Sequence, residues 1–329
     1  MQRTKFARLM TCASMICGGM LLPHGESLAA ENGAGIYLLG FRGPLAGIIP
    51  EPGVYFQNDF YFYGGSAGAN RELPFNGVLA AGLSARLPVD APTILWSTPF
   101  QIAGGNLAFS ATVPIGGPTI DAALELSSPA LSSVIARNQH DSVVTVGDPL
   151  LSTFIGWHSG NFHWNGSITV NVPVGDYTEG ALANIAFHRW AADLAGAGTW
   201  LDPATGHELS GAFGFTFNGT NPATNYTTGT EFHLEYAAIQ HFSKQFDAGL
   251  VGYFYQQLTA DSGSGAKLGP FEGQVTALGG AVGYNFLLGQ TPLSARIKLY
   301  REFDVSQRLQ GTSGFLTLAM PLGNPMASK

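Results

Sequence analysis

The chain alternates between apolar and polar residues over long stretches, and the clearest one covers residues 161–172. Phe162 and Ile168 fall on one side of this stretch, whereas His163 and Asn165 fall on the other. Successive side chains of a β-strand point to opposite faces, so this period of two predicts a strand. The polar side carries no charge, and the length matches the ~9–11 residues that a tilted strand needs to cross a bilayer. The stretch therefore favours a membrane-spanning strand.

The same alternation recurs along the chain and predicts an all-β fold. It indicates further strands at 54–63, 78–87, 93–103, 106–115, 150–158, 190–200, 209–217, 231–241, 246–258, 275–286, 293–303 and 316–322. Clusters of Gly, Pro, Asp and Asn separate several of these segments, as in hairpin turns. We expect a transmembrane antiparallel β-barrel of roughly 12–14 strands, with an even number as in bacterial barrels. Residues 120–141 are the least regular part, and we expect a long loop or a protruding hairpin there.

Composition narrows the class of protein. Hydrophobic residues make up 45% of the chain and charged residues only 11%, against about 25% charged residues in soluble domains. Such a chain is not disordered. Beyond the N-terminus, it has no apolar run of the ~18 residues that a spanning helix requires. A periplasmic β-sandwich remains an alternative, although a soluble sandwich of this size would carry more surface charge.

The first thirty residues have the pattern of a secretory signal peptide. Basic residues precede an apolar run at 9–22, and small residues precede a cleavage site near Ala30. Both cysteines, Cys12 and Cys17, lie in this segment, so the mature protein has neither a disulfide nor a thiol nucleophile. We expect a single barrel domain at 31–329. The net charge of −7 gives no basic footprint, which argues against a nucleic-acid partner.

Polar residues on the face opposite the lipid-facing one are candidates for lining the lumen. They are Tyr55, Asp59, Tyr61, His163, Asn165, Glu231, His233, Glu235, Arg296, Lys298 and Glu302. Arg296, Lys298 and Glu302 share one face and could set the selectivity of a pore. Alternatively, they could pair with acidic neighbours across the lumen and only stabilise the barrel.

Some of these residues could also bind a metal ion or take part in catalysis. Glu231, His233 and Glu235 share one face of a strand, but metal ligands at this spacing lie ~6–7 Å apart and need help from elsewhere. A hydrolase would need a nucleophile beside His163 or His233. No phosphate-binding or dinucleotide motif is present. We therefore expect no enzyme activity, no cofactor and no metal.

Several short motifs resemble one known family. They lie at 36–40, 52–59, 146–149, 156–158, 172–177, 199–203, 228–233 and 302–305. From about residue 36 to residue 322, the chain is similar to the meta-pathway of phenol degradation family of proteobacterial outer-membrane transporters or channels. The resemblance implies a location in the outer membrane of a Gram-negative cell.

Two functions follow from this resemblance and the barrel pattern. The first is passive uptake of small, aromatic or otherwise hydrophobic compounds, with outer-membrane lipid, these solutes and the barrel-assembly machinery as partners. The chain continues beyond Leu322 in a polar tail, without the terminal Phe or Trp that the assembly machinery commonly reads. The second function is that of a non-transporting structural or surface-binding barrel, plugged by side chains or by residues 120–141.

Overall fold

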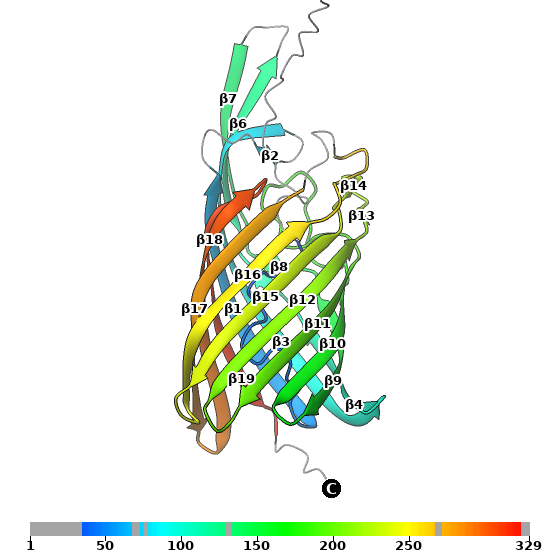
Figure 1. Ribbon diagram of the computed structural model, residues 1–329. Helices are drawn as coiled ribbons and strands as arrows, with labels where there is room; N and C mark the ends of the chain where they lie inside the picture. Colours follow the sequence, from blue (N-terminus) through cyan, green and yellow to red (C-terminus); the bar gives the residue numbers. More distant parts are fainter. Residues whose placement is uncertain (1–34, 68–72, 76–77, 129–132, 267–271, 324–329) are drawn as a thin grey trace, which may run out of the picture.

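Antiparallel strands dominate the computed structural model, which describes residues 35–67, 73–75, 78–128, 133–266 and 272–323 (Figure 1). The expected signal peptide at 1–30 and the end of the polar tail lie outside the described residues. Within those residues, no helix has the length and apolarity that a membrane span requires.

Twelve strand positions close into a barrel, because β1 (Gly53–Ala67) pairs with β19 (Gln310–Pro321). Closure leaves no unpaired edge, which is the condition for strands to lie in lipid. The other continuous wall strands are β3 (Val78–Ile102), β10 (Phe162–Asn171), β11 (Ala191–Asp202), β12 (His207–Asn218), β15 (Glu231–His241), β16 (Phe246–Gln257), β17 (Gln274–Leu288) and β18 (Thr291–Ser306).

Two neighbouring strand positions of the wall are broken into pieces. Against β3 run, in succession, β4 (Gly105–Thr112), β5 (Ile115–Gly116) and β6 (Thr119–Ser128). The chain returns through β7 (Ser133–Ser142), β8 (Thr145–Val146) and β9 (Leu150–Ser159). Pro114, Pro118 and Pro149 lie in the breaks, where proline lacks the N–H that a central strand needs. Three short strands complete the list: β2 (Leu73–Phe75), β13 (Thr220–Asn221) and β14 (Tyr226–Thr227).

The outer face of the barrel is apolar. On β12, Leu209, Phe213 and Phe217 are about half exposed, whereas Ser210 and Thr216 are buried inside. The same contrast continues around the wall, where large exposed apolar side chains alternate with buried inward ones. This band takes the place that a hydrophobic core has in a soluble protein, because lipid covers it.

The two ends of the barrel differ. Tight turns at 103–104, 160–161, 203–206 and 289–290 close one end, near the C-terminus in Figure 1. Longer connections, such as 172–190 and 219–230, lie at the other end, where the β6–β7 hairpin rises above the rim (Figure 1). Short turns face the periplasm in barrels of this kind and long loops face outward. We assign the two ends accordingly.

Residues 35–50 run inside the barrel, from the loop end down to the start of β1 (Figure 1). Hydrogen-bonded turns at 38–41, 43–46 and 45–48 fold this stretch, which we call the luminal segment. The expectation that residues 120–141 plug the interior is wrong. The described residues of this stretch, 120–128 and 133–141, belong to β6 and β7, which satisfy their backbone groups by pairing with each other and so extend the wall outward. The expected protruding hairpin is therefore the correct alternative.

Candidate functional site

The inward face of β15 holds the upper part of the luminal segment. His233 is buried, with Nε2 2.8 Å from Oδ2 of Asp193 on β11. Tyr37 of the luminal segment stacks on the imidazole, with 3.6 Å between ring centroids and 15° between planes. Two residues before His233, Glu231 accepts a 2.6 Å hydrogen bond from the Tyr255 hydroxyl. An acid and an imidazole of β15 are thus bound to protein partners at this level.

The middle of the luminal segment is held at Gly40. Its N–H donates to Oε1 of Glu235 at 2.6 Å, and its carbonyl oxygen accepts a 2.6 Å hydrogen bond from Nζ of Lys298. Gly40 has a φ of +86°, and a Cβ at this position would lie 2.7 Å from the Tyr300 ring. Both facts require glycine. Two charged wall residues therefore hold the backbone of Gly40, Glu235 at its N–H and Lys298 at its carbonyl oxygen.

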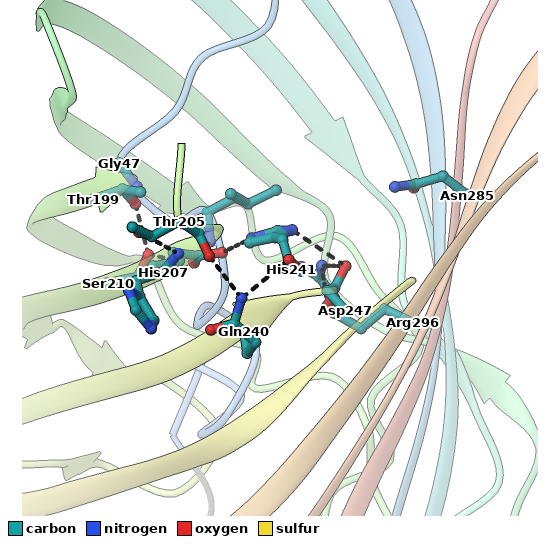
Figure 2. Close-up of polar contacts among 12 residues, drawn as sticks. Gly47, Thr199, Thr205, His207, Ser210, Gln240, His241, Asp247, Asn285 and Arg296 are labelled. Carbon is teal, nitrogen blue, oxygen red and sulfur yellow. Dashed lines mark hydrogen bonds and ion pairs between the residues drawn. The ribbon is translucent and has the colours of Figure 1, made fainter. Parts of the chain in front are cut away.

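A chain of charged groups holds the lower part of the luminal segment (Figure 2). Glu208 accepts from the N–H of Leu45 at 2.6 Å, and its other oxygen lies 2.7 Å from Nε2 of His241. Nδ1 of His241 lies 3.9 Å from Asp247, which also receives both short bonds of Arg296, at 3.0 and 2.9 Å. The network gives the buried carboxylates of Glu208 and Asp247 several hydrogen bonds each, as buried charges require.

The segment reaches the wall most closely near the periplasmic end. Gly47 donates its N–H to Oγ1 of Thr199 at 2.9 Å, and Nδ2 of Asn165 donates to the carbonyl of Ala46 at 2.8 Å. A Cβ on Gly47 would lie 2.5 Å from the backbone oxygen of His163 and the backbone nitrogen of Thr199. The imidazole of His163 is itself half-buried nearby.

The remaining predicted lumen residues bind partners in the wall. Asp59 is buried and accepts from Thr317 at 2.5 Å. Glu302 accepts from the hydroxyl of Tyr253 at 2.8 Å and from the N–H of Gly311 at 2.6 Å. These carboxylates sit on the inner surface but are already engaged.

Two predicted tyrosines have different positions. Tyr61 is buried, with its ring centroid 4.8 Å from that of Phe315. The hydroxyl of Tyr55 donates to the carbonyl of Glu51 at 2.8 Å, at the periplasmic start of β1. Only Tyr61 belongs to the packed interior.

In the charged ladder of β18, Arg296 alone has the acidic partner that the pairing alternative requires, as far as the described residues show. Arg296 is bonded to Asp247, Lys298 to the luminal segment and Glu302 to wall donors. In the described part of the chain, no group of three or more His, Cys, Asp or Glu side chains has a metal-binding arrangement. His233 and His163 form no hydrogen bond with a serine hydroxyl among the described residues.

An apolar cavity of about 280 Å³ lies between the luminal segment and the opposite wall. Its apolar lining comes from β3, β9, the luminal segment and the 172–190 loop: Leu87, Val89, Ala91, Leu95, Leu150, Phe154, Ile36, Leu38, Phe41, Ile185 and Phe187. Hydroxyl groups in the lining pair with each other, as Thr93 does with Thr112 at 2.7 Å. The lumen is thus polar where the luminal segment binds and apolar on the far side.

Sequence patterning missed this cavity because β3 carries apolar side chains on its inward face as well as on its outward face. Val89 and Ala91 point inward and are buried, whereas Ile94 and Trp96 are 45% and 42% exposed on the outside. In an otherwise alternating chain, a strand that is apolar on both faces is the signal that could have revealed it.

The 172–190 loop covers the outer end of the cavity and is held by two carboxylates from outside the loop. Asp141 accepts from the N–H groups of Leu182 and Ala183 at 2.9 and 3.0 Å. Asp148 is 2% exposed and accepts hydrogen bonds from the N–H groups of Gly175, Phe187 and His188 at 2.8–3.1 Å, and from Nδ2 of Asn171 at 3.0 Å. Asp148 was not among the predicted site residues, and neither were Arg42, Asp193 and Glu208. All are charged residues at inward positions of a charge-poor chain, which is the signal that would have selected them.

A family model described as "MetA-pathway of phenol degradation" matches residues 65–318. The chain belongs to this family. This phenol-degradation family member has no match among curated protein sequences.

One solved structure shows the same fold, and two others are less similar. The COG4313 outer membrane channel from Pseudomonas putida F1 is similar with a TM-score of 0.65 and 12% identity, over 84% of this chain and 98% of that one. The translocator domain of the autotransporter NalP from Neisseria meningitidis gives a TM-score of 0.43 at 14% identity, over 83% and 90% of the two chains. A FadL homologue from Pseudomonas aeruginosa gives 0.40 at 11%, over 85% and 92%. The family member therefore shares the closed β-barrel fold of the COG4313 outer membrane channel.

Proposed function

We propose that the protein passes small, aromatic or otherwise hydrophobic solutes across the outer membrane by diffusion. The observation that carries the proposal is the apolar cavity of about 280 Å³ inside the barrel. An apolar cavity of ~150 Å³ suffices to bind benzene, so this one has room for a single substituted ring. The family assignment to phenol degradation supports the same class of solute.

The path through the lumen passes two obstacles. The 172–190 loop lies over the outer end of the cavity and the luminal segment lies beside it. Solute entry and exit therefore require motion of the loop or of the segment. Loop motions of this kind take nanoseconds to microseconds or longer and need no energy source.

The test is solute influx into vesicles whose outer leaflet contains lipopolysaccharide, because plain phospholipid bilayers are themselves permeable to apolar solutes. We expect radiolabelled toluene to enter faster with the protein than without it. Ala91→Phe, which fills the cavity, should slow influx at least tenfold. Ala111→Phe is the matched control, since Ala111 is exposed on the lipid face of the adjoining strand β4.

A second candidate function is a non-transporting structural barrel. The grip of Lys298, Glu235 and Glu208 on the luminal segment favours it, because buried charge-assisted hydrogen bonds hold a segment firmly. If influx with the wild-type protein equals that of protein-free vesicles, this function replaces the first one.

A further inference from the structure

One cation in the lumen, Arg42, forms no ion pair with any acid in the described part of the chain. Arg42 of the luminal segment lines the apolar cavity, and its only hydrogen bond among the described residues runs from Nη2 to the hydroxyl of Ser167, at 2.7 Å. Its Nη1 is buried and has no hydrogen-bond partner there. An uncompensated buried donor on a charged group is costly. A hydrogen-bond acceptor on Nη1 of Arg42, preferably an anionic one, would remove this cost.

The acids around the same cavity do not supply that acceptor. Asp148 is saturated by N–H groups of the 172–190 loop, and Asp193 is engaged with His233 and with Thr216, whose hydroxyl donates at 2.8 Å. Glu235 accepts from the backbone of Gly40 through one oxygen. Its charge acts on Arg42 from a longer distance, but neither a hydrogen bond nor an ion pair joins the two in the described structure.

The aromatic ring of Phe154 lies next to this unpaired donor. The guanidinium carbon of Arg42 lies 5.7 Å from the centroid of the Phe154 ring, and both residues line the cavity. From there the apolar lining continues through Leu95 and Ala91 of β3 toward the 172–190 loop. A ligand that fits has a flat apolar body and a single anionic group at one end.

We propose that the cavity is a binding site for small aromatic carboxylates, with the carboxylate on Nη1 of Arg42 and the ring against Phe154 and the β3 lining. Guanidinium groups are well suited to this role because their N–H groups match the carboxylate oxygens. The inference rests on the proposed function, since it assigns the solute class to the same cavity. It goes beyond that function by making the solute anionic rather than merely apolar.

The experiment measures binding to the folded protein in detergent by isothermal titration calorimetry, with three probes. Benzoate carries the charge, benzamide is its neutral counterpart of similar shape, and toluene has only the apolar body. We expect benzoate to bind at least tenfold more tightly than benzamide. This comparison uses the wild-type protein, so it holds even if a variant fails to fold.

Two variants locate the interaction. Arg42→Met should weaken benzoate at least tenfold and leave toluene within twofold, and Ala91→Phe should abolish binding of all three probes. Arg42→Gln serves the same purpose as Arg42→Met if the latter does not fold. Ala111→Phe, on the lipid face, should change nothing.

The outcomes separate the two proposals. Equal binding of benzoate and benzamide, or unchanged benzoate affinity in a folded Arg42 variant, overturns the carboxylate site. Toluene influx in the vesicle assay would then still uphold the proposed function. Absence of binding by every probe, together with absence of toluene influx, overturns both.

Discussion

Nζ of Lys298 donates a 2.6 Å hydrogen bond to the carbonyl oxygen of Gly40, although the two residues are 258 positions apart in the chain. Lys298 belongs to β18 in the barrel wall, and Gly40 belongs to the luminal segment. The same ammonium group also donates to Phe41, at 2.6 Å, and lies 4.5 Å from the centroid of the Phe315 ring. One wall cation therefore helps to hold a stretch of chain within the lumen.

Replacing Lys298 by Met should loosen the luminal segment. The variant keeps the side-chain length but leaves two carbonyl oxygens without their charged donor, which costs about 2 kcal/mol. We expect a lower melting temperature and a severalfold higher ion conductance in planar bilayers. Arg301→Met is the control, because Arg301 is exposed and bonds only to Thr312 among the described residues. Unchanged conductance with both variants would show that the segment does not restrict ion flow.

Replacing Gly47 by Val should displace the periplasmic end of the luminal segment. The added Cβ would meet backbone atoms of His163 and Thr199 at 2.5 Å, and backbone in a sheet cannot move aside cheaply. We expect a loss of about 1–3 kcal/mol of unfolding free energy, together with faster protease cleavage in the segment. Gly166→Val is the matched change, since a Cβ there meets nothing within 4 Å. If both variants melt alike, the close approach at Gly47 contributes nothing to stability.

Replacing Asp148 by Asn should release the 172–190 loop. The amide would offer one acceptor in place of two and would direct its own N–H groups at the donors that Asp148 now satisfies. We expect trypsin to cleave after the buried Arg189 at least tenfold faster, as measured by mass spectrometry. Asp176→Asn tests the same loop at an exposed carboxylate that accepts only from Thr145 among the described residues. Protection of Arg189 that survives Asp148→Asn would contradict this role.

The alternation along the chain correctly predicted the barrel class. One predicted strand boundary was wrong, and the structure gives a physical reason for it. The separate strands expected at 78–87 and 93–103 are one strand, β3, which pairs with β1 through Pro88 and Pro92. The carbonyls of these prolines accept from Gly117 and Val113, which lie at the breaks of the neighbouring wall position. In a sequence, a proline usually marks the end of a strand. The missing N–H of Pro88 and Pro92 costs less stability here, because the neighbouring strand position is interrupted and needs fewer N–H donors.

The sequence by itself determined that this chain is an all-β barrel, because a wall strand turns an apolar face to lipid and a different face to the lumen, which leaves a period of two in most of the strands. It could not determine what occupies the lumen. The luminal segment has no such period, and its place depends on Glu208, Glu235 and Lys298 of three different strands. Only closure of the barrel brings those strands around one space, and only then does a polar wall hold the segment while an apolar wall leaves the cavity beside it.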